Sequence, residues 1–269
     1  MNLLSADHIR ELIGGAARSN LESLDVFSEI GSTNSYLLQQ TCPGIGNYRV
    51  ALAEFQTAGR GRMNRDWYSP PSSGVCLSLA YTFRRMPDQL PSLSLAIASR
   101  IAEELLGYGV RDLGLKWPND IVVRDAKLCG ILSEVVPASA DGLTVVTGIG
   151  LNVDLANAGT KTGSSTGIGR MIDLASCSDS LPSRSEIAAA LIVGVFDTMQ
   201  RFAAAGFSQF LAAWNQHDWL RGRRIKVETG DRIIAGVAEG IDQDGALLLS
   251  SGGAVRRLTS GSVILDQSS

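Results

Sequence analysis

Residues 53–68, which read AEFQTAGRGRMNRDWY, carry the side chains of this chain that are best suited to chemistry on an anion. Two glycines in this run, Gly59 and Gly61, would each cost a helix about 1 kcal/mol, but they leave backbone N–H groups free to face a ligand. Arginine is permanently charged and presents a planar fork of donors that fits phosphate or carboxylate. Residues 60–65, here called the arginine loop, are therefore predicted to bind an anion. A solvated basic surface loop is the competing interpretation.

The composition limits the classes of protein to which this chain can belong. Its 269 residues leave room for one large domain plus a small one, or for two medium domains. Hydrophobic residues make up 45% and charged residues 19%, which is typical of a globular fold. The net charge of −3 argues against a general DNA-binding protein, because such proteins usually carry an excess of basic residues.

The cysteines indicate a reducing environment, and the histidines have no metal-ligand spacing. The four cysteines, none of which forms a CxxC pair, are Cys42, Cys76, Cys129 and Cys177. The two histidines, His8 and His217, form no metal-ligand cluster in the sequence. No apolar run approaches the roughly 20 residues of a membrane span, and the N-terminus lacks the basic-then-apolar pattern of a signal peptide. We therefore expect a cytoplasmic protein with no membrane partner.

The segments on both sides of the arginine loop are predicted to position it. Residues 48–57 and 74–83 have the pattern of strands, which favours an antiparallel pair around the loop. Upstream, a strand at residues 25–30 runs into a glycine, and Ser32 or Thr33 caps a helix. A hydroxyl-capped helix start after a strand and a glycine makes a polar pocket floor. Plain helix capping explains the same residues and stays open as an alternative.

Two later stretches add a cation and more glycines. The KWPND run ends one short strand, turns at residues 118–120 and leads into a hairpin with Lys127 near its tip. Residues 143–153 have the pattern of a strand that contains Gly148 and Gly150. Glycine weakens a strand unless backbone must approach something closely, so these two are predicted to form one wall of a ligand cleft. A plain β-bulge is the alternative.

Besides the helix that Ser32 or Thr33 caps and a short one at residues 210–214, helices are expected in three further places. One follows Ser5 and is ended by the glycine pair 14–15, with little else before the first strand. A second covers residues 93–107, where apolar residues recur at helical spacing. A third opens at the capping box of residues 183–186. The Gly/Ser/Thr/Asn-rich residues 156–170 have the composition of a mobile loop.

The arrangement of these segments predicts an α+β fold with a second, smaller domain. After residue 221 the sequence offers five short strand-like runs separated by turns, which fit a small barrel. The predicted division is an N-terminal helical extension over residues 1–24, a main domain over 25–220 and the barrel over 221–269.

Taken together, the motifs resemble those of biotin–protein ligases (biotin–[acetyl-CoA-carboxylase] ligases) over nearly the whole chain. They are GSTN at 31–34, AEFQTAGRGR at 53–62, KWPND at 116–120, KLCGIL at 127–132 and GIGLNV at 148–153. The resemblance implies a catalytic domain related to class II aminoacyl-tRNA synthetases, with a mixed, largely antiparallel sheet, followed by an SH3-like domain. It also implies that biotin and ATP give biotinyl-5′-AMP and pyrophosphate, and that biotin then passes to a lysine of a carrier protein.

The resemblance implies roles for individual residues. Lys127 and Arg62 would be the catalytic residues. The biotin-binding residues would be Ser32, Thr33, Asn34, Gln56, Arg60, Gly61, Arg62, Lys127, Gly130, Gly148 and Gly150. The residues on ATP or the adenylate would be Arg60, Arg62, Arg65, Trp67, Lys127 and Asn152. Asp120 or its neighbour Asn119 would either place the Mg²⁺ that comes with ATP or hold the arginine loop.

The sequence departs from the family pattern at Met63 and Asn64, where many relatives carry small or basic residues, and at Cys129, which replaces a common alanine. These differences leave the closed shape of the arginine loop open. Bifunctional members of the family begin with a winged helix-turn-helix domain, whereas only about 25 residues precede the motifs here. We therefore expect the monofunctional type, with no DNA partner.

The expected partner is the biotin carboxyl carrier protein of acetyl-CoA carboxylase or of a similar biotin-dependent carboxylase, with a homodimer as a candidate assembly. Three other interpretations remain. A lipoate–protein ligase shares the fold class and the adenylation chemistry, but the arginine loop with Trp67 and the KWPND turn argue against it. A non-catalytic, biotin-sensing regulator would need to bind DNA. An adaptor built on the small barrel would leave Lys127 without a role.

Overall fold

The computed structural model describes residues 3–139, 142–156 and 170–265. Most of the predicted loop at 156–170 lies outside these residues. Ser5 caps helix α1 (Ala6–Leu12) by accepting a hydrogen bond from the N–H of His8, as predicted. The expectation of little more before the first strand was wrong, because a second helix, α2 (Gly15–Asn20), begins at Gly15 and buries Ala17. Strand β1 (Leu21–Phe27) also begins earlier than predicted.

Seven strands form the main sheet, in the order β1-β2-β3-β7-β6-β5-β4. Their bounds after β1 are β2 Tyr48–Ala53, β3 Gly74–Phe83, β4 Leu113–Lys116, β5 Asp120–Val123, β6 Ala126–Ser139 and β7 Gly142–Asn152. Only the β1–β2 pair is parallel among the neighbours of this sheet. The predicted α+β fold with a mixed, largely antiparallel sheet is confirmed.

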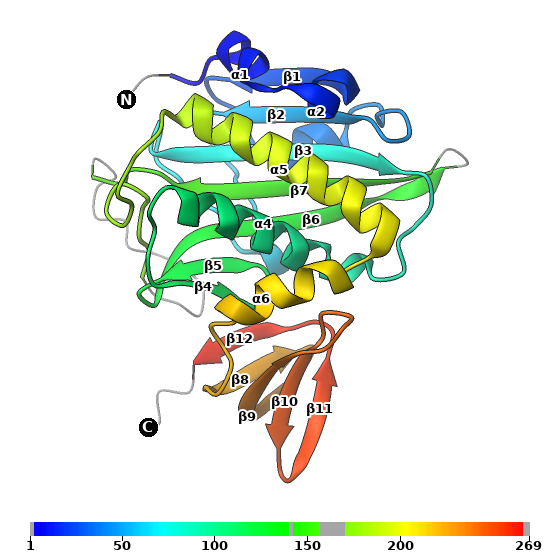
Figure 1. The fold of residues 1–269 in the computed structure, drawn as a ribbon, viewed down its shortest axis with the longest axis vertical. Coiled ribbons are helices and arrows are strands. Elements are labelled where there is room, and N and C mark those ends of the chain that lie inside the picture. Colours follow the sequence, from blue (N-terminus) through cyan, green and yellow to red (C-terminus); the bar gives the residue numbers. More distant parts are fainter. Residues whose placement is uncertain (1–2, 140–141, 157–169, 266–269) are drawn as a thin grey trace.

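Helices cover both faces of the main sheet. Figure 1 shows α4 (Leu93–Gly107) and α5 (Arg184–Ala205) crossing one face, where α5 packs on β3 and α4 on β6. The short helix α3 (Thr33–Leu38) packs on β2, β3 and β7, where Leu37 meets Ala80 and Val146 in a separate small cluster. Because side chains alternate along a strand, Ser78 and Gly148, two residues from these partners, also face α3.

Helix α5 bears on the expectation that no segment could span a membrane. Its 22 residues are long and apolar enough to cross a membrane by length and composition alone, a test that buried core helices also pass. However, 61% of the most apolar part of the helix is buried inside the fold. The helix begins at the predicted capping box, in which Ser183 and Glu186 exchange side-chain to backbone hydrogen bonds. The apolar character of α5 is that of a core helix.

Five strands form the antiparallel C-terminal sheet, in the order β11-β10-β9-β8-β12. Their bounds are β8 Arg224–Thr229, β9 Arg232–Ile241, β10 Leu247–Ser251, β11 Ala254–Leu258 and β12 Ser262–Leu265. The short η3 turn (Ser208–Phe210) and helix α6 (Leu211–His217) precede them and lie between the two sheets (Figure 1). The five runs predicted after residue 221 are therefore all strands.

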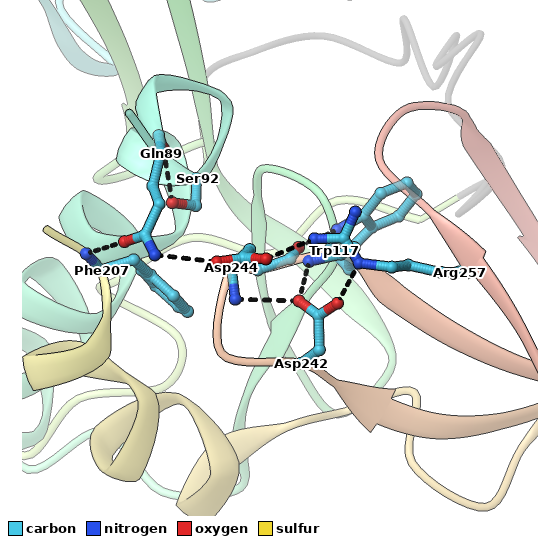
Figure 2. Close-up of polar contacts among 9 residues, drawn as sticks. Gln89, Ser92, Trp117, Phe207, Asp242, Asp244 and Arg257 are labelled. Carbon is cyan, nitrogen blue, oxygen red and sulfur yellow. Dashed lines mark hydrogen bonds and ion pairs between the residues drawn. The ribbon is translucent and has the colours of Figure 1, made fainter. Parts of the chain in front are cut away.

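A turn of the C-terminal sheet fixes the two sheets together, as Figure 2 shows. The indole of Trp117 donates a hydrogen bond of 3.0 Å to the carbonyl of Gly245. Gln89 donates to the carboxylate of Asp244 at 2.8 Å, and Arg257 pairs with both Asp242 and Asp244. Gly245 has φ +81°, and a Cβ atom added there would lie 2.6 Å from the Cβ atom of Ser92. The turn therefore fits closely only with glycine at this position.

Candidate active site

One pocket opens on the face of the main sheet that carries α3. It brings together every site residue that the sequence predicted except Asn152. The predicted residues that line it are Ser32, Thr33, Asn34, Gln56, Arg60, Gly61, Arg62, Arg65, Trp67, Asp120, Lys127, Gly130, Gly148 and Gly150. Sequence segments more than 100 residues apart thus meet in one place.

Glycines in β7 form one wall of this pocket. A Cβ atom at Gly148 would lie 2.4 Å from Oδ1 of Asn34, and one at Gly150 would lie 2.2 Å from the ring of Trp67. Both distances are much shorter than van der Waals contact. The side chains of Asn34 and Trp67 therefore lie directly against the β7 backbone, where only glycine leaves room for them. Strand β7 pairs in unbroken register with β3 through both glycines. The β-bulge interpretation was therefore wrong, and the cleft-wall interpretation agrees with the geometry.

Neutral polar groups at one end of the pocket form a continuous hydrogen-bonded chain. Gln56 accepts through Oε1 from the backbone N–H of Thr33 at 2.8 Å, and the same oxygen lies 3.1 Å from the Thr33 hydroxyl. The hydroxyls of Thr33 and Ser78 are 2.7 Å apart, and Ser78 donates to Oδ1 of Asn34 at 2.6 Å. The amide of Asn34 then donates to Glu134 at 2.9 Å. These groups are held in place before any ligand binds.

The sequence analysis missed Ser78, which is a member of this chain, and Glu134, the carboxylate that accepts from its last member. Ser78 is completely buried in the middle of β3, and it lines the pocket. A serine inside an otherwise apolar strand was the available signal, since a buried hydroxyl needs a partner. Glu134 offered no comparable signal, because its two partners come from α3 and from the arginine loop.

The arginine loop is a tight reversal between β2 and β3. Its backbone closes through hydrogen bonds from the N–H of Gly61 to the carbonyl of Arg65 and from that of Trp67 to Gly59. At its tip, Met63 and Asn64 both have φ +56°, a left-handed conformation that asparagine tolerates better than methionine. The departure from the family pattern at Met63 and Asn64 thus falls on the most demanding backbone of the loop.

The three arginines of the loop have different surroundings. Arg60 is exposed and pairs with Glu134, while its other nitrogen donates to Ser35 at 3.1 Å. Burial lowers the pKa of the Arg62 guanidinium and the Asp120 carboxylate opposes that effect, so the group stays charged. Arg65 donates to the hydroxyl of Ser262, in the C-terminal sheet, at 2.8 Å. The arginine loop thus contacts Glu134, the lining of the pocket and the C-terminal sheet.

Lys127 lies at the centre of the pocket, at the start of β6. Its ammonium is 2.7 Å from Oδ1 of Asp120 in an ion pair that lacks hydrogen-bond alignment, and it is 5.4 Å from the ring centroid of Trp67. Both members of the pair are buried. The β5–β6 hairpin that positions it turns through Arg124 and Asp125, both with positive φ. The predicted hairpin is confirmed.

Asn152 does not line the pocket. Its amide donates to the backbone carbonyls of Lys127 and Ile172, at 3.3 and 3.1 Å. Its buried Oδ1 has no hydrogen-bond partner among the residues that the structure describes. Asn152 therefore holds the backbone that carries Lys127, and contact with the adenine stays a prediction.

Comparisons with known proteins agree with this geometry. Residues 26–152 match the Biotin/lipoate A/B protein ligase family, and residues 221–266 match the Biotin protein ligase C terminal domain. The chain is 33% identical over 275 residues to the bifunctional ligase/repressor BirA of Salmonella typhimurium, covering 98% of this chain and 79% of the relative. It is 33% identical over 260 residues to the biotin–[acetyl-CoA-carboxylase] ligase of Mycobacterium tuberculosis, covering 94% and 92%.

The fold is also similar to solved structures. The biotin protein ligase of Aquifex aeolicus in complex with biotin and ATP superposes with a TM-score of 0.71 at 24% identity, covering 92% of this chain and 100% of that one. A Helicobacter pylori biotin acetyl coenzyme A carboxylase synthetase with bound biotinylated ATP gives a TM-score of 0.54 at 20% identity. The matched domains, the sequence relatives and the fold confirm the resemblance: the chain belongs to the biotin protein ligase family.

Proposed function

We propose that the protein is an ATP-dependent biotin–protein ligase that forms biotinyl-5′-AMP and then transfers biotin to a lysine of a carrier protein. One observation carries this proposal. The pocket has a neutral, hydrogen-bonded end at Thr33 and Gln56 and a cationic end at Arg62 and Lys127, with a glycine wall between them. Biotin has the matching polarity, with a neutral ureido ring at one end and a carboxylate at the other.

The neutral end suits a ureido ring because its own groups already fix their orientation. Gln56 accepts through its oxygen from Thr33, which leaves its amide nitrogen to donate to a ligand carbonyl. Ser32, which caps α3 by accepting from the N–H of Ser35, retains a hydroxyl proton to donate. Preorganised partners of this kind lower the entropic cost of binding.

The cationic end suits the adenylation step. A carboxylate oxygen of biotin attacks the α-phosphorus of ATP, the bond from that phosphorus to the bridging oxygen of the β-phosphate breaks, and pyrophosphate leaves with the bonding electrons. Two anions must approach each other, so fixed positive groups stabilise the transition state. Lys127 and Arg62 are the residues proposed for this role. In the second step the acceptor amine attacks the acyl carbon, and AMP leaves.

Mg²⁺ is proposed to accompany ATP at Asp120. Mg²⁺ is commonly held by one or two carboxylates together with substrate phosphates, and Asp120 is a buried carboxylate that lines the pocket. The residues that the structure describes contain no group of three or more His, Cys, Asp or Glu side chains arranged for a metal, so the phosphates would supply the remaining ligands. Bound there, Mg²⁺ would neutralise phosphate charge.

The proposed acceptor is the biotin carboxyl carrier protein of acetyl-CoA carboxylase or of a similar carboxylase. It is supported by the naming of relatives such as the Mycobacterium tuberculosis enzyme. A cytoplasmic location, a homodimer and the absence of sequence-specific DNA binding belong to the same proposal. Cell fractionation tests the location, and sedimentation with and without biotin and ATP tests the homodimer. DNA-binding assays test the absence of sequence-specific DNA binding.

The decisive experiment incubates the protein with ATP and either biotin or lipoate and measures pyrophosphate release. Biotin should support release, and adding a carrier domain with labelled biotin should give labelled carrier. Release with lipoate alone would support a lipoate–protein ligase, which the matched family also includes. Biotin binding with no pyrophosphate release would support a non-catalytic sensor.

A further inference from the structure

Glu54 is a buried carboxylate that the proposed chemistry does not use. It belongs to the AEFQTAGRGR motif and directly follows β2, yet it does not line the active-site pocket. Its side chain is 9% exposed and forms an ion pair of 2.6 Å with Arg184, whose side chain is 1% exposed. An apolar pair of similar volume is often at least as stable as a buried ion pair, so stability alone does not account for these two side chains.

The Glu54 carboxylate accepts hydrogen bonds from three separate parts of the chain. Arg184 donates to Oε2 from the start of α5, and the N–H of Leu4 donates to Oε1 from the N-terminal segment. The hydroxyl of Ser72, just before β3, donates to Oε2 at 3.0 Å. Burial alone would raise the pKa of Glu54, but these hydrogen bonds bring the pKa below its ordinary value. The carboxylate is therefore ionised at neutral pH.

Ser72 joins the two ends of the segment that carries the arginine loop. Its N–H also donates to the backbone carbonyl of Glu54, at 3.1 Å. The backbone of Ser72 has φ +60°, a conformation that is unfavourable for a residue with a side chain. Two hydrogen bonds to Glu54 offset this strain and close the base of the segment. We call Glu54, Ser72 and Arg184 the loop clamp.

The arm that leads into the arginine loop has an anchor of its own. Residues 55–59 lie beside the segment before α3, through the bridge between Ile30 and Gln56 and backbone hydrogen bonds of 2.8–3.1 Å. Gln56 is also hydrogen-bonded to Thr33. The neutral end of the pocket should therefore keep its shape without the loop clamp.

The arm that leads out of the loop is connected to the clamp by a stiff link. It runs from Trp67 to Ser72 through two successive prolines, and proline fixes its own φ. The ring of Trp67 lies directly against Gly150, and the Lys127 ammonium is 5.4 Å from its centroid. A displacement of Ser72 is therefore passed on to Trp67, at the cationic end.

We infer that Glu54 is a positioning residue for the adenylation step: through Ser72, its carboxylate fixes the outgoing arm and so holds Trp67 beside Lys127. Arg184 keeps the carboxylate in place from the start of α5. The inference rests on the proposed function for the reaction that is affected. The position of the arm, however, can be measured without any reaction.

Ser72→Gly releases the outgoing arm and leaves the ion pair intact. Glycine accepts φ +60° without strain, so the melting temperature should stay within about 3 °C of that of the wild type. Trypsin, which cleaves after the arginines of the loop, should cut the ligand-free protein about tenfold faster. The kcat of biotin-dependent pyrophosphate exchange should fall about tenfold, and the Kd for biotin, measured by calorimetry, should change less than about twofold.

Glu54→Gln should raise cleavage and lower kcat further, by about 10- to 100-fold each, because it weakens the contacts to Ser72 and Arg184 together. The matched control is Glu22→Gln. Glu22 of β1 also accepts from a backbone N–H, an amide and an arginine, but it lies outside the pocket. This control should keep the cleavage rate and kcat of the wild type. If Glu54→Gln does not fold, Ser72→Gly decides the inference alone.

The double variant Glu54→Gln, Arg184→Met separates positioning from stability. Glu54→Gln should lower the melting temperature, and the double variant should recover much of it, because both buried charges are then gone. Cleavage and kcat should stay at the values of Glu54→Gln, since Ser72 still lacks the carboxylate. Recovery of all three together would show that Glu54 acts through stability alone and would overturn the inference. Wild-type cleavage and kcat in Ser72→Gly would overturn it as well.

The two proposals fail in different ways. Acceptor labelling by the wild type, with unaltered cleavage and kcat in the clamp variants, removes the positioning role and leaves the ligase function standing. Absence of biotin-dependent adenylation in the wild type, with faster cleavage in the clamp variants, does the reverse.

Discussion

The two ends of the active-site pocket solve the problem of ligand binding in opposite ways. At the neutral end, Thr33, Ser78 and Asn34 are buried and satisfy one another through hydrogen bonds of 2.6–2.7 Å. At the cationic end, the Asp120 carboxylate lies 2.7 Å from the Lys127 ammonium and also faces the charge of Arg62. The neutral end is therefore complete without ligand, whereas the charged end is not.

The difference follows from the charge of what each end is proposed to bind. Neutral hydrogen-bonding groups can be paired inside the protein and still offer further donors and acceptors, at little cost in stability. A polyanion has to meet cations whose charge is not already cancelled, and such cations destabilise the empty protein. Removing a cation whose charge is not cancelled should thus lower activity while raising stability, whereas removing a group of the neutral end should lower both.

The largest effect is expected for Lys127→Ala. Removing the central cation should lower biotin-dependent pyrophosphate exchange about 10³-fold, because the carboxylate and the α-phosphate then meet without it. Direct biotin binding, measured by calorimetry, should weaken far less, because the neutral end stays intact. Lys226→Ala serves as the control for the loss of a lysine. Exchange close to the wild-type rate would contradict the assignment of Lys127 as catalytic.

Substitution of the two wall glycines should separate the ends. Gly148→Ala places a methyl group 2.4 Å from Asn34 Oδ1, so it should raise the biotin KM about 10- to 100-fold and destabilise the fold. Gly150→Ala places one 2.2 Å from the Trp67 ring, so it should lower the adenylation rate by a similar factor with a smaller change in biotin KM. Equal effects of both variants on both constants would mean that the two ends are not independent.

The pH dependence of stability is a third way to test the comparison. The pKa of Lys116 is lowered from 10.5 to about 8. Between these values the unfolded lysine binds a proton that the folded one does not, so the free energy of unfolding should rise with pH, by about 1–3 kcal/mol in total for this group. Below pH 8 both states are protonated, and the contribution is constant and destabilising.

The measurement is the difference between wild type and Lys116→Met in chemical unfolding, from pH 7.5 to 10. Burial raises the pKa of Cys129 to about 12 and that of Cys177 to about 11, which opposes the trend above pH 9, but both proteins share those groups. Their difference isolates Lys116. Parallel stability curves would show that the lysine is not destabilised by burial.

Much of the fold and of the site followed from local signals in the sequence. The cap at Ser32, the helix at 93–107, the capping box at 183–186 and the hairpin before Lys127 each depend on residues that are neighbours in the chain. The helix that starts at Gly15 was missed because a glycine pair was taken as a stop signal. Here it only separates two helices.

The remaining features depend on contacts that no local pattern records. Asn152 follows Gly148 and Gly150 at the two-residue spacing of a strand, which predicts the same face of the sheet. Residues 171–174 return beside Lys127, however, and their backbone takes up the Asn152 side chain. The pocket that Lys116 lines likewise forms only where the C-terminal sheet packs on the main sheet.

The smallest effect is expected at Glu134, the residue that joins the two ends. One carboxylate oxygen accepts from Asn34, and the other pairs with Arg60. Glu134→Gln keeps an acceptor for Asn34 and removes the charge opposite Arg60. Since Arg60 is exposed, the pair should contribute only about 0.2–1 kcal/mol. Trypsin should therefore cleave the ligand-free arginine loop about two- to fivefold faster, with the biotin KM unchanged.

Glu134→Leu sharpens this test, because it removes both contacts at once. The same rise in cleavage should then come with a higher biotin KM, since the buried Asn34 amide loses the shorter of its two hydrogen bonds and keeps only the one to the carbonyl of Leu132.

In the wild type, biotin with ATP should protect the loop, because its arginines exchange Glu134 and solvent for the anions of the ligands. If ligands leave cleavage unchanged, the loop does not close over them. A higher biotin KM in Glu134→Gln alone would show that the ion pair of Arg60 affects binding at the neutral end. The two ends would then be coupled through the Glu134 side chain.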